Sequence, residues 1–137
     1  MSPAKGRTQT CGKTEAHTRL THARAFIDTA KLVLDVADDA APNVAASLAV
    51  LAGIAACDAA CCFALGRRPR GQDHREAITI LSGIEAGGKA MGGDLARLLD
   101  MKDNAQYGMA FVTTRAAGQA VKWAQRLVAA AESIIQS

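Results

Sequence analysis

The densest group of chemically useful side chains lies in the segment from Gly66 to Glu76. It holds four arginines, one histidine and two acidic residues: Arg67, Arg68, Arg70, Arg75, His74, Asp73 and Glu76. Histidine can accept or donate a proton near neutral pH, and arginine carries a permanent charge on a planar group that suits phosphate oxygens. This combination predicts phosphodiester chemistry on RNA. His74 would act as general base or acid, and Arg67 or Arg68 would stabilise the charge that builds on the phosphate.

Two aspartates could assist these residues. Asp73 could cap a helix that begins near His74, and the imidazole would then lie at a helix N-terminus, where its neutral form is favoured. Asp58 stands in an otherwise apolar stretch, where an unpaired carboxylate would be costly. Its partner could be an arginine of the following segment or His74, in a structural ion pair or as a catalytic orienter. The Arg-rich segment could also be only a polar turn with solvated charges and a structural histidine.

Other basic residues could hold an RNA backbone, because phosphate neutralisation dominates nonspecific nucleic-acid affinity. Two of them flank His74, and two lie in a stripe on the last predicted helix. These candidate RNA-binding residues are Arg70, Arg75, Lys122 and Arg126. The stripe, which also contains Arg115 and Gln119, could equally be the solvated face of a helix.

The cysteines do not form a metal-binding pattern. They are Cys11 in the polar N-terminal tail and Cys57, Cys61 and Cys62 in an apolar stretch. Cys57 and Cys61 are spaced i,i+4, but free cysteine usually packs as a small hydrophobic residue. A zinc site would need further ligands, and the nearby candidates are Asp58 and His74. His17 and His22 lack acidic neighbours at ligand spacing and are interpreted as surface residues. We expect no metal and no cofactor.

Helical periodicity predicts the two helices that precede the Arg-rich segment. Apolar residues recur at i, i+3, i+4 and i+7 from Glu15 to Asp38, which predicts an amphipathic helix. A second, almost wholly apolar helix should run from Val44 to Leu65, with Asn43 as its N-cap and Gly66 as its end. A stretch of this length could span a membrane. Its many alanines and Asp58 instead favour the central helix of a soluble bundle.

Three further helices are expected after the Arg-rich segment. Asp73 would cap a short helix, and the glycine-rich residues 82–93 would form a frayed helix or a loop. Asp94 would start another helix, and Thr113 or Thr114 would cap a long last helix. The last helix carries the clearest apolar stripe in the chain.

These elements predict an all-α, up-and-down bundle of four to five helices. Residues 15–137 would form one domain, and residues 1–14 a flexible N-terminal tail. Hydrophobic residues make up 50% of the chain and charged residues 21%, which suits a soluble helical domain. The net charge of +3 is too small to indicate nucleic-acid binding by itself. Because residues 1–14 lack an apolar signal region, we expect a cytoplasmic protein that contacts no membrane.

The order of the helices, the Arg-rich turn and the position of His74 together resemble the HEPN superfamily over roughly residues 15 to 136. Members are small helical bundles, and many carry an arginine followed four to six residues later by a histidine. In this chain five residues separate Arg68 from His74 and six separate Arg67 from it, whereas Arg70 is too close.

The resemblance implies a homodimer that cleaves RNA without a metal ion at a site formed by both protomers. Such proteins often act as toxins that a nucleotidyltransferase-like antitoxin neutralises. Superfamily members without nuclease activity serve as binding or dimerisation modules. A non-catalytic partner protein is therefore the alternative hypothesis, and whether the chain is an enzyme stays open at this point.

Overall fold

The chain folds into five helices and one short two-stranded ribbon. The computed structural model describes residues 8–70 and 74–136. In chain order, its elements are β1 (Thr8–Thr10), α1 (Lys13–Leu34), α2 (Ala41–Leu65), β2 (Arg67–Pro69), α3 (Arg75–Leu81), α4 (Gly88–Tyr107) and α5 (Thr114–Gln136).

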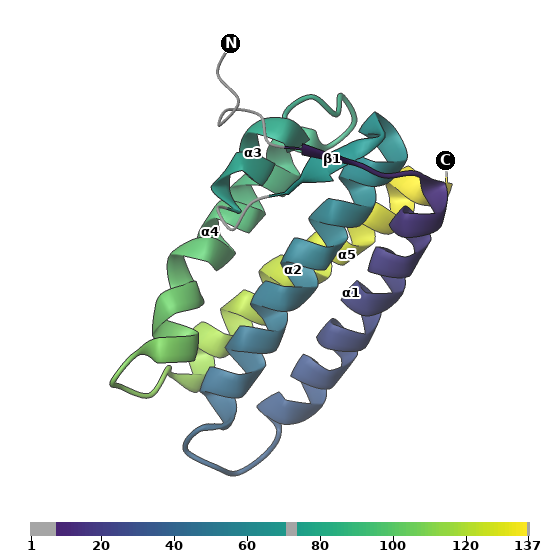
Figure 1. The fold of residues 1–137 in the computed structure, drawn as a ribbon. Coiled ribbons are helices and arrows are strands. Elements are labelled where there is room, and N and C mark those ends of the chain that lie inside the picture. Colours follow the sequence, from purple (N-terminus) through teal and green to yellow (C-terminus); the bar gives the residue numbers. More distant parts are fainter. Residues whose placement is uncertain (1–7, 71–73, 137) are drawn as a thin grey trace.

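Four long helices lie side by side and alternate in direction, and the short α3 lies at one end with the ribbon (Figure 1). We call this end the head. The opposite end, which carries the α1–α2 and α4–α5 loops, is the foot. The predicted helical bundle is therefore confirmed in its coarse form. The antiparallel pairing of β1 with β2 was not predicted, because each strand has only three residues and no alternating pattern.

Helix α2 is the central helix and packs against α1, α4 and α5. Most of its buried residues are alanine, glycine or cysteine, whose small side chains allow neighbouring helices to approach closely. A Cβ atom on Gly53 would lie only 2.5 Å from Cδ1 of Leu98 in α4. Among the described helices, α2 is the one that is long and apolar enough to cross a membrane, with a mean hydropathy of 2.2 in its best window. Its neighbours bury 67% of that window, as expected for the core helix of a bundle.

Two predicted helix starts differ from the structure. Asn43 is not an N-cap, because α2 begins at Ala41 with Pro42 in its first turn. The Asn43 side chain instead donates to the carbonyl oxygen of Ala105 (3.3 Å) and accepts from the backbone N–H of Val112 (2.9 Å). Asn43 therefore fastens the end of α4 and the α4–α5 loop to α2.

Helix α4 begins at Gly88, not at Asp94, so part of the glycine-rich stretch is helical. The preceding Gly87 has a φ of 88°, which a glycine adopts without strain. A Cβ atom on Gly88 would clash with the carbonyl oxygen of Leu81 at the end of α3. Glycine is therefore needed where α3 and α4 meet, and this packing overrides its poor helix propensity. At α5 the prediction is confirmed, because Thr113 Oγ1 accepts a hydrogen bond from the N–H of Ala116 (3.0 Å).

The predicted flexible tail is wrong for residues 8–14. They form β1 and the start of α1, and a disulfide bond joins Cys11 to Cys62 near the end of α2. The backbone N–H of Cys11 also donates to the carbonyl oxygen of Gly66 (3.0 Å). Cys57 and Cys61 are free and buried, which confirms the packing interpretation for these two. The described residues contain no cluster of His, Cys, Asp or Glu that could hold a metal ion.

Candidate functional site

Asp58 is the centre of a charged cluster on the head half of α2. Its side chain is only 11% exposed. Arg19 of α1 approaches Oδ2 with two nitrogens, Nε at 3.2 Å and NH2 at 3.1 Å. NH1 of Arg68 lies 4.0 Å from the same oxygen. The prediction that Asp58 needs a cationic partner is confirmed, and the nearer partner is Arg19, which was not among the candidates.

Arg68 is held between α2 and the N-terminal strand. It lies in β2 directly opposite Gln9 of β1, and its side chain is about one third exposed. NH2 of Arg68 donates to Oε1 of Gln9 (3.0 Å), and NH1 donates to the carbonyl oxygen of Pro69 (3.3 Å). Its guanidinium therefore has an acceptor on β1 and a carboxylate on α2.

The electrostatics of Asp58 connect this cluster to His74. Burial raises the pKa of the Asp58 carboxyl above its usual value of 3.8, and the charges of Arg19, Arg68 and His74 partly offset this rise. His74 therefore lies close enough to Asp58 for a charged imidazole to stabilise the carboxylate. It is half-buried at the N-cap position of the short helix α3. The predicted cap, Asp73, lies outside the described residues.

The remaining arginines of the segment lie in different surroundings from Arg68. Arg67 and Arg70 are exposed at the head. Arg75 NH2 contacts Oδ1 of Asp100 in α4 at 2.6 Å, in a pair whose side chains are both mostly exposed. The segment thus presents three exposed guanidiniums, of Arg67, Arg70 and Arg75, and one half-buried imidazole, and the guanidinium of Arg68 is engaged with Asp58.

The two predicted RNA-binding residues of α5 are not part of this cluster. Arg126 bonds to the buried Asp94 of α4 through NH2–Oδ1 (2.6 Å) and Nε–Oδ2 (3.1 Å), and Arg97 contacts the same carboxylate at 3.0 Å. The hydrogen bond and charge of Asp94 raise the pKa of Arg126. Lys122 is exposed. Arg126 therefore has a structural contact that shares no residue with the Asp58 cluster.

Sequence reasoning missed three residues of the cluster. Arg19 and Gln9 contact Asp58 and Arg68, and NH1 of Arg19 lies 3.2 Å from Nδ1 of His22. His22 is exposed, as predicted, but it extends the line of polar side chains along α1. The one available signal was the unpaired charge of Asp58, which required a cation. Nothing in the sequence selects a residue 39 positions away.

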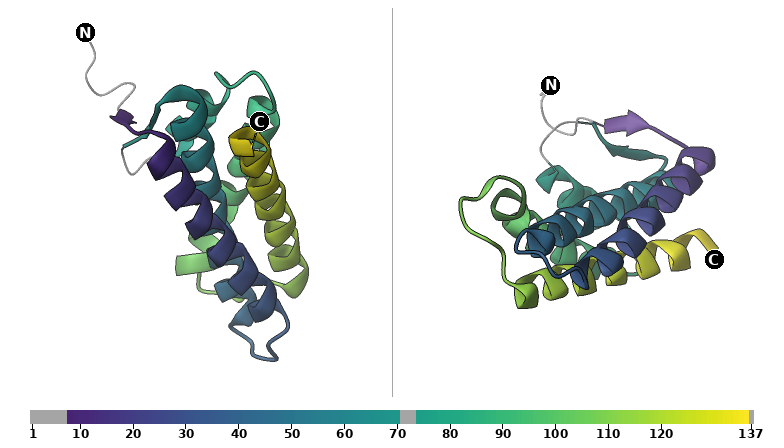
Figure 2. Two further views of the ribbon diagram at one scale, coloured as in Figure 1. Left: turned by 90° about the vertical axis from the view of Figure 1, so that its right-hand side faces the viewer. Right: turned by 90° about the horizontal axis from the view of Figure 1, so that it is seen from below.

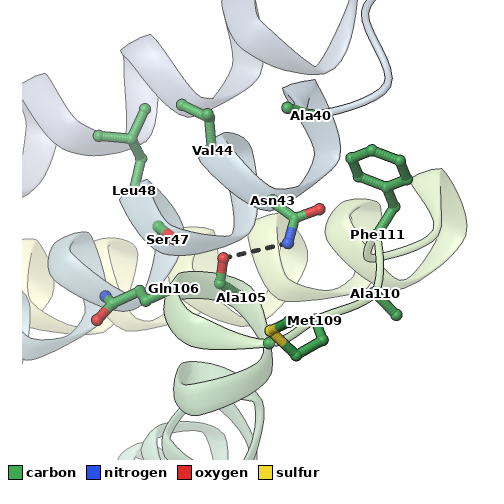
Figure 3. A pocket seen from close by; sticks show the side chains of 11 residues that line it. Ala40, Asn43, Val44, Ser47, Leu48, Ala105, Gln106, Met109, Ala110 and Phe111 are labelled. Atoms are coloured by element: carbon green, nitrogen blue, oxygen red, sulfur yellow. Dashed lines mark hydrogen bonds between the residues drawn. The ribbon is translucent and has the colours of Figure 1, made fainter.

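A separate hollow lies at the foot. A pocket of about 550 Å³ opens between the first turns of α2 and the end of α4 (Figure 3). Val44 and Leu48 form one wall, and Met109 and Phe111 of the α4–α5 loop form another. A second pocket of about 500 Å³ adjoins the same loop. Met109 is fully exposed and Phe111 is 66% exposed, so the loop presents apolar side chains to solvent.

No model of a known protein family matches this sequence, and no curated protein matches it.

Proposed function

We propose that the chain is a HEPN-like domain that cleaves RNA without a metal ion at the head of the bundle. The observation that carries the proposal is that Arg68 lies 4.0 Å from the buried Asp58 and that the charge of His74 lowers the pKa of the same carboxyl, beside the exposed Arg67. Imidazole and guanidinium groups supply proton transfer and phosphate stabilisation, which this reaction requires.

Each residue has a defined role in the proposed reaction. Arg67 and Arg68 hold the scissile phosphate, with Arg70 and Arg75 beside them on the RNA backbone. His74 removes the proton of the ribose 2′-hydroxyl, whose oxygen then attacks phosphorus. The 5′ oxygen leaves with a proton from a second acid, which His74 of the other protomer supplies in a homodimer. The products are a 2′,3′-cyclic phosphate and a 5′-hydroxyl.

Further groups assist this chemistry in the proposal. Asp58 orients Arg68 and His74, and Asp73, the sequence neighbour of His74, assists it. Lys122 and Arg126 guide the RNA at a distance from the reacting phosphate. The protein acts in the cytoplasm as a toxin, and its partner is a nucleotidyltransferase-like antitoxin.

An RNA-cleavage assay in the presence of a chelator tests the proposal. We expect the native chain to cut a single-stranded oligoribonucleotide and His74→Ala to cut at least about 100-fold more slowly, which is typical of losing a general acid or base. Arg67→Ala and Arg68→Ala should also cut slowly. His17→Ala is the matched control, because His17 is an exposed histidine on the head half of α1 and lies beside Phe63. Intact RNA with the native chain both in the presence and in the absence of dithiothreitol, or equal cutting by His74→Ala, would reject the proposal.

The foot favours a second candidate function, a non-catalytic binding or dimerisation module. Exposed Met and aromatic side chains beside a pocket are typical of protein–protein interfaces, and Tyr107, Met109 and Phe111 form such a group. Sedimentation analysis of the native chain and of Phe111→Ser tests this function. A dimer that dissociates with Phe111→Ser and persists with His74→Ala would support it. A monomeric native chain would count against dimerisation.

A further inference from the structure

We propose that the Cys11–Cys62 disulfide is a redox latch. It holds β1 on β2 and keeps Arg68 bonded to Gln9, and its reduction releases the strand and the arginine. The consequence for RNA cleavage rests on the proposed function, but the release of the strand and of the arginine does not. The residues concerned are β1 and Cys11, which contact the rest of the chain at the head.

The contacts of β1 are few apart from the disulfide. Three residue pairs join the strands, with Thr8 opposite Pro69, Gln9 opposite Arg68 and Thr10 opposite Arg67. Gln9 and Thr10 are exposed, so β1 buries little apolar surface. The ribbon lies on the side of the bundle away from α5 (Figure 2). A hydrogen bond from the N–H of Cys11 to the carbonyl oxygen of Gly66 (3.0 Å) also holds the end of β1. Because a two-stranded ribbon is at best marginally stable in water by itself, the covalent bond is the strongest restraint on β1.

The latch acts on Arg68 through Gln9. In the oxidised chain, the guanidinium of Arg68 donates to Oε1 of Gln9 and lies 4.0 Å from the Asp58 carboxylate. The contact with Gln9 holds the guanidinium toward β1 and away from a ligand in solvent. If β1 leaves, Gln9 leaves with it, and NH2 of Arg68 loses its acceptor. The guanidinium can then turn outward to bind a phosphate.

The chemistry requires a dithiol as reductant. One thiolate of the dithiol attacks the sulfur of Cys11, which is 9% exposed, and the thiolate of Cys62, which is 1% exposed, leaves and takes up a proton. The second thiol of the reductant then attacks the reductant's other sulfur, which is bonded to Cys11 in the mixed disulfide, and releases Cys11 as a thiol. Two electrons and two protons pass to the protein, and the dithiol becomes a cyclic disulfide.

The two free cysteines do not compete for this exchange. Cys61 is buried beside Cys62, and burial is the main cause that raises the pKa of its thiol to about 12. Burial also raises the pKa of Cys57. Because the thiolate is the attacking species, both groups are inert near neutral pH. Cys11 therefore pairs only with Cys62, and reduction gives a single product in which both are thiols. In the cytoplasm, where we propose that the protein acts, disulfides are usually transient or redox-sensing.

Two measurements on the full chain test the latch without RNA. The native chain, with and without dithiothreitol, is compared with Cys11→Ser, and Cys61→Ala serves as the matched control that keeps the disulfide. Because the N–H of Cys11 bonds to Gly66 and bonded pairs alternate along an antiparallel ladder, Gln9 and Arg68 form the hydrogen-bonded pair of the ribbon. We expect reduction and Cys11→Ser to speed amide hydrogen exchange at Gln9 and Arg68 at least tenfold and to leave the middle of α5 unchanged. We also expect them to speed modification of Arg68 by phenylglyoxal severalfold relative to Arg67, which is already exposed while the disulfide is intact.

A third measurement separates the latch from the nuclease. If exchange and Arg68 modification respond to reduction and RNA cleavage rises severalfold, both proposals are supported. If they respond but neither redox state cuts RNA, the latch stands and the proposed function fails. Unchanged exchange, unchanged Arg68 modification, or faster cleavage in the oxidised chain would overturn the latch. As a second variant, Gln9→Ala should raise Arg68 modification even while the disulfide is intact.

Discussion

Removal of Arg19 should destabilise the protein more than removal of any exposed arginine, because it leaves the Asp58 carboxylate without its nearest cation. Arg19→Met keeps much of the apolar stem and deletes the guanidinium. At a separation of 3.1 Å, the gross attraction is about 5 kcal/mol with an effective dielectric constant of about 20. The Arg19 side chain is 28% exposed, so solvent screens part of this attraction. We expect the free energy of unfolding to fall by about 3 kcal/mol, at the lower end of the cost of breaking a buried pair.

The matched control is Arg24→Met. Arg24 lies on the same helix and contacts Glu132 of α5 at 2.6 Å, but these two side chains are 46% and 35% exposed. A surface pair of this kind contributes about 0.5 kcal/mol. Urea denaturation of the three chains, with the disulfide intact, measures both losses. If Arg19→Met and Arg24→Met cost the same, the assignment of Asp58 as a buried charge that needs Arg19 is refuted.

The pH dependence provides a second signature. Burial raises the folded-state pKa of Asp58 above 3.8, so the folded chain holds this proton more tightly than the unfolded chain. Protonation of Asp58 therefore favours folding, and its contribution to stability is lost as pH rises from about 4 through the folded-state pKa. Arg19→Met should raise that pKa further. The difference between Arg19→Met and the native chain should be largest at pH 7 and should shrink near about pH 3.5, where the carboxyl is neutral.

Three substitutions elsewhere in the chain test the packing and the cross-link. Cys11→Ser should lower the free energy of unfolding by about 4 kcal/mol, because the disulfide closes a loop of 51 residues. Urea denaturation should give the same midpoint for this variant as for the reduced native chain. Gly118→Ala should stabilise α5 by about 0.5–1 kcal/mol, because a Cβ atom there meets no neighbour within 4 Å. Gly53→Ala should cost about 1–3 kcal/mol, because its Cβ atom would press on Leu98, and a melting temperature at or above that of the native chain would contradict the close α2–α4 contact.

The helices could be predicted because they depend on local periodicity. The apolar stripe that fixes α5 repeats over more than four turns, and Thr113 caps it as expected. The start of α4 could not be predicted, because glycine has a poor helix propensity. Gly88 becomes favourable only against Leu81, and Gly87 only where the chain adopts a positive φ. Propensity is a weak signal where tertiary packing decides.

The site could be predicted only where its residues are neighbours in sequence. Arg67, Arg68 and His74 share one segment, and the isolated charge of Asp58 indicated a missing cation. The contributions of Arg19, Gln9 and Cys11 depend on how α1 and β1 return to the end of α2. Cys11 and Cys62 are 51 residues apart, and four cysteines allow several pairings. Such long-range partners follow from the fold and not from any local pattern.

The three ion pairs between long helices have a consequence for the alignment of the bundle. Asp58 with Arg19 joins α2 to α1, Asp94 with Arg126 joins α4 to α5, and Arg24 with Glu132 joins α1 to α5. The interfaces of α2 are built largely from alanine, and such smooth, uniform surfaces could slide along one another by a helical turn at little cost in apolar contact. A shift of one turn would separate each pair and would leave the buried Asp58 without its nearest cation. These ion pairs therefore fix the position of each helix along the axis of its neighbour. The apolar contacts alone would define that position only loosely.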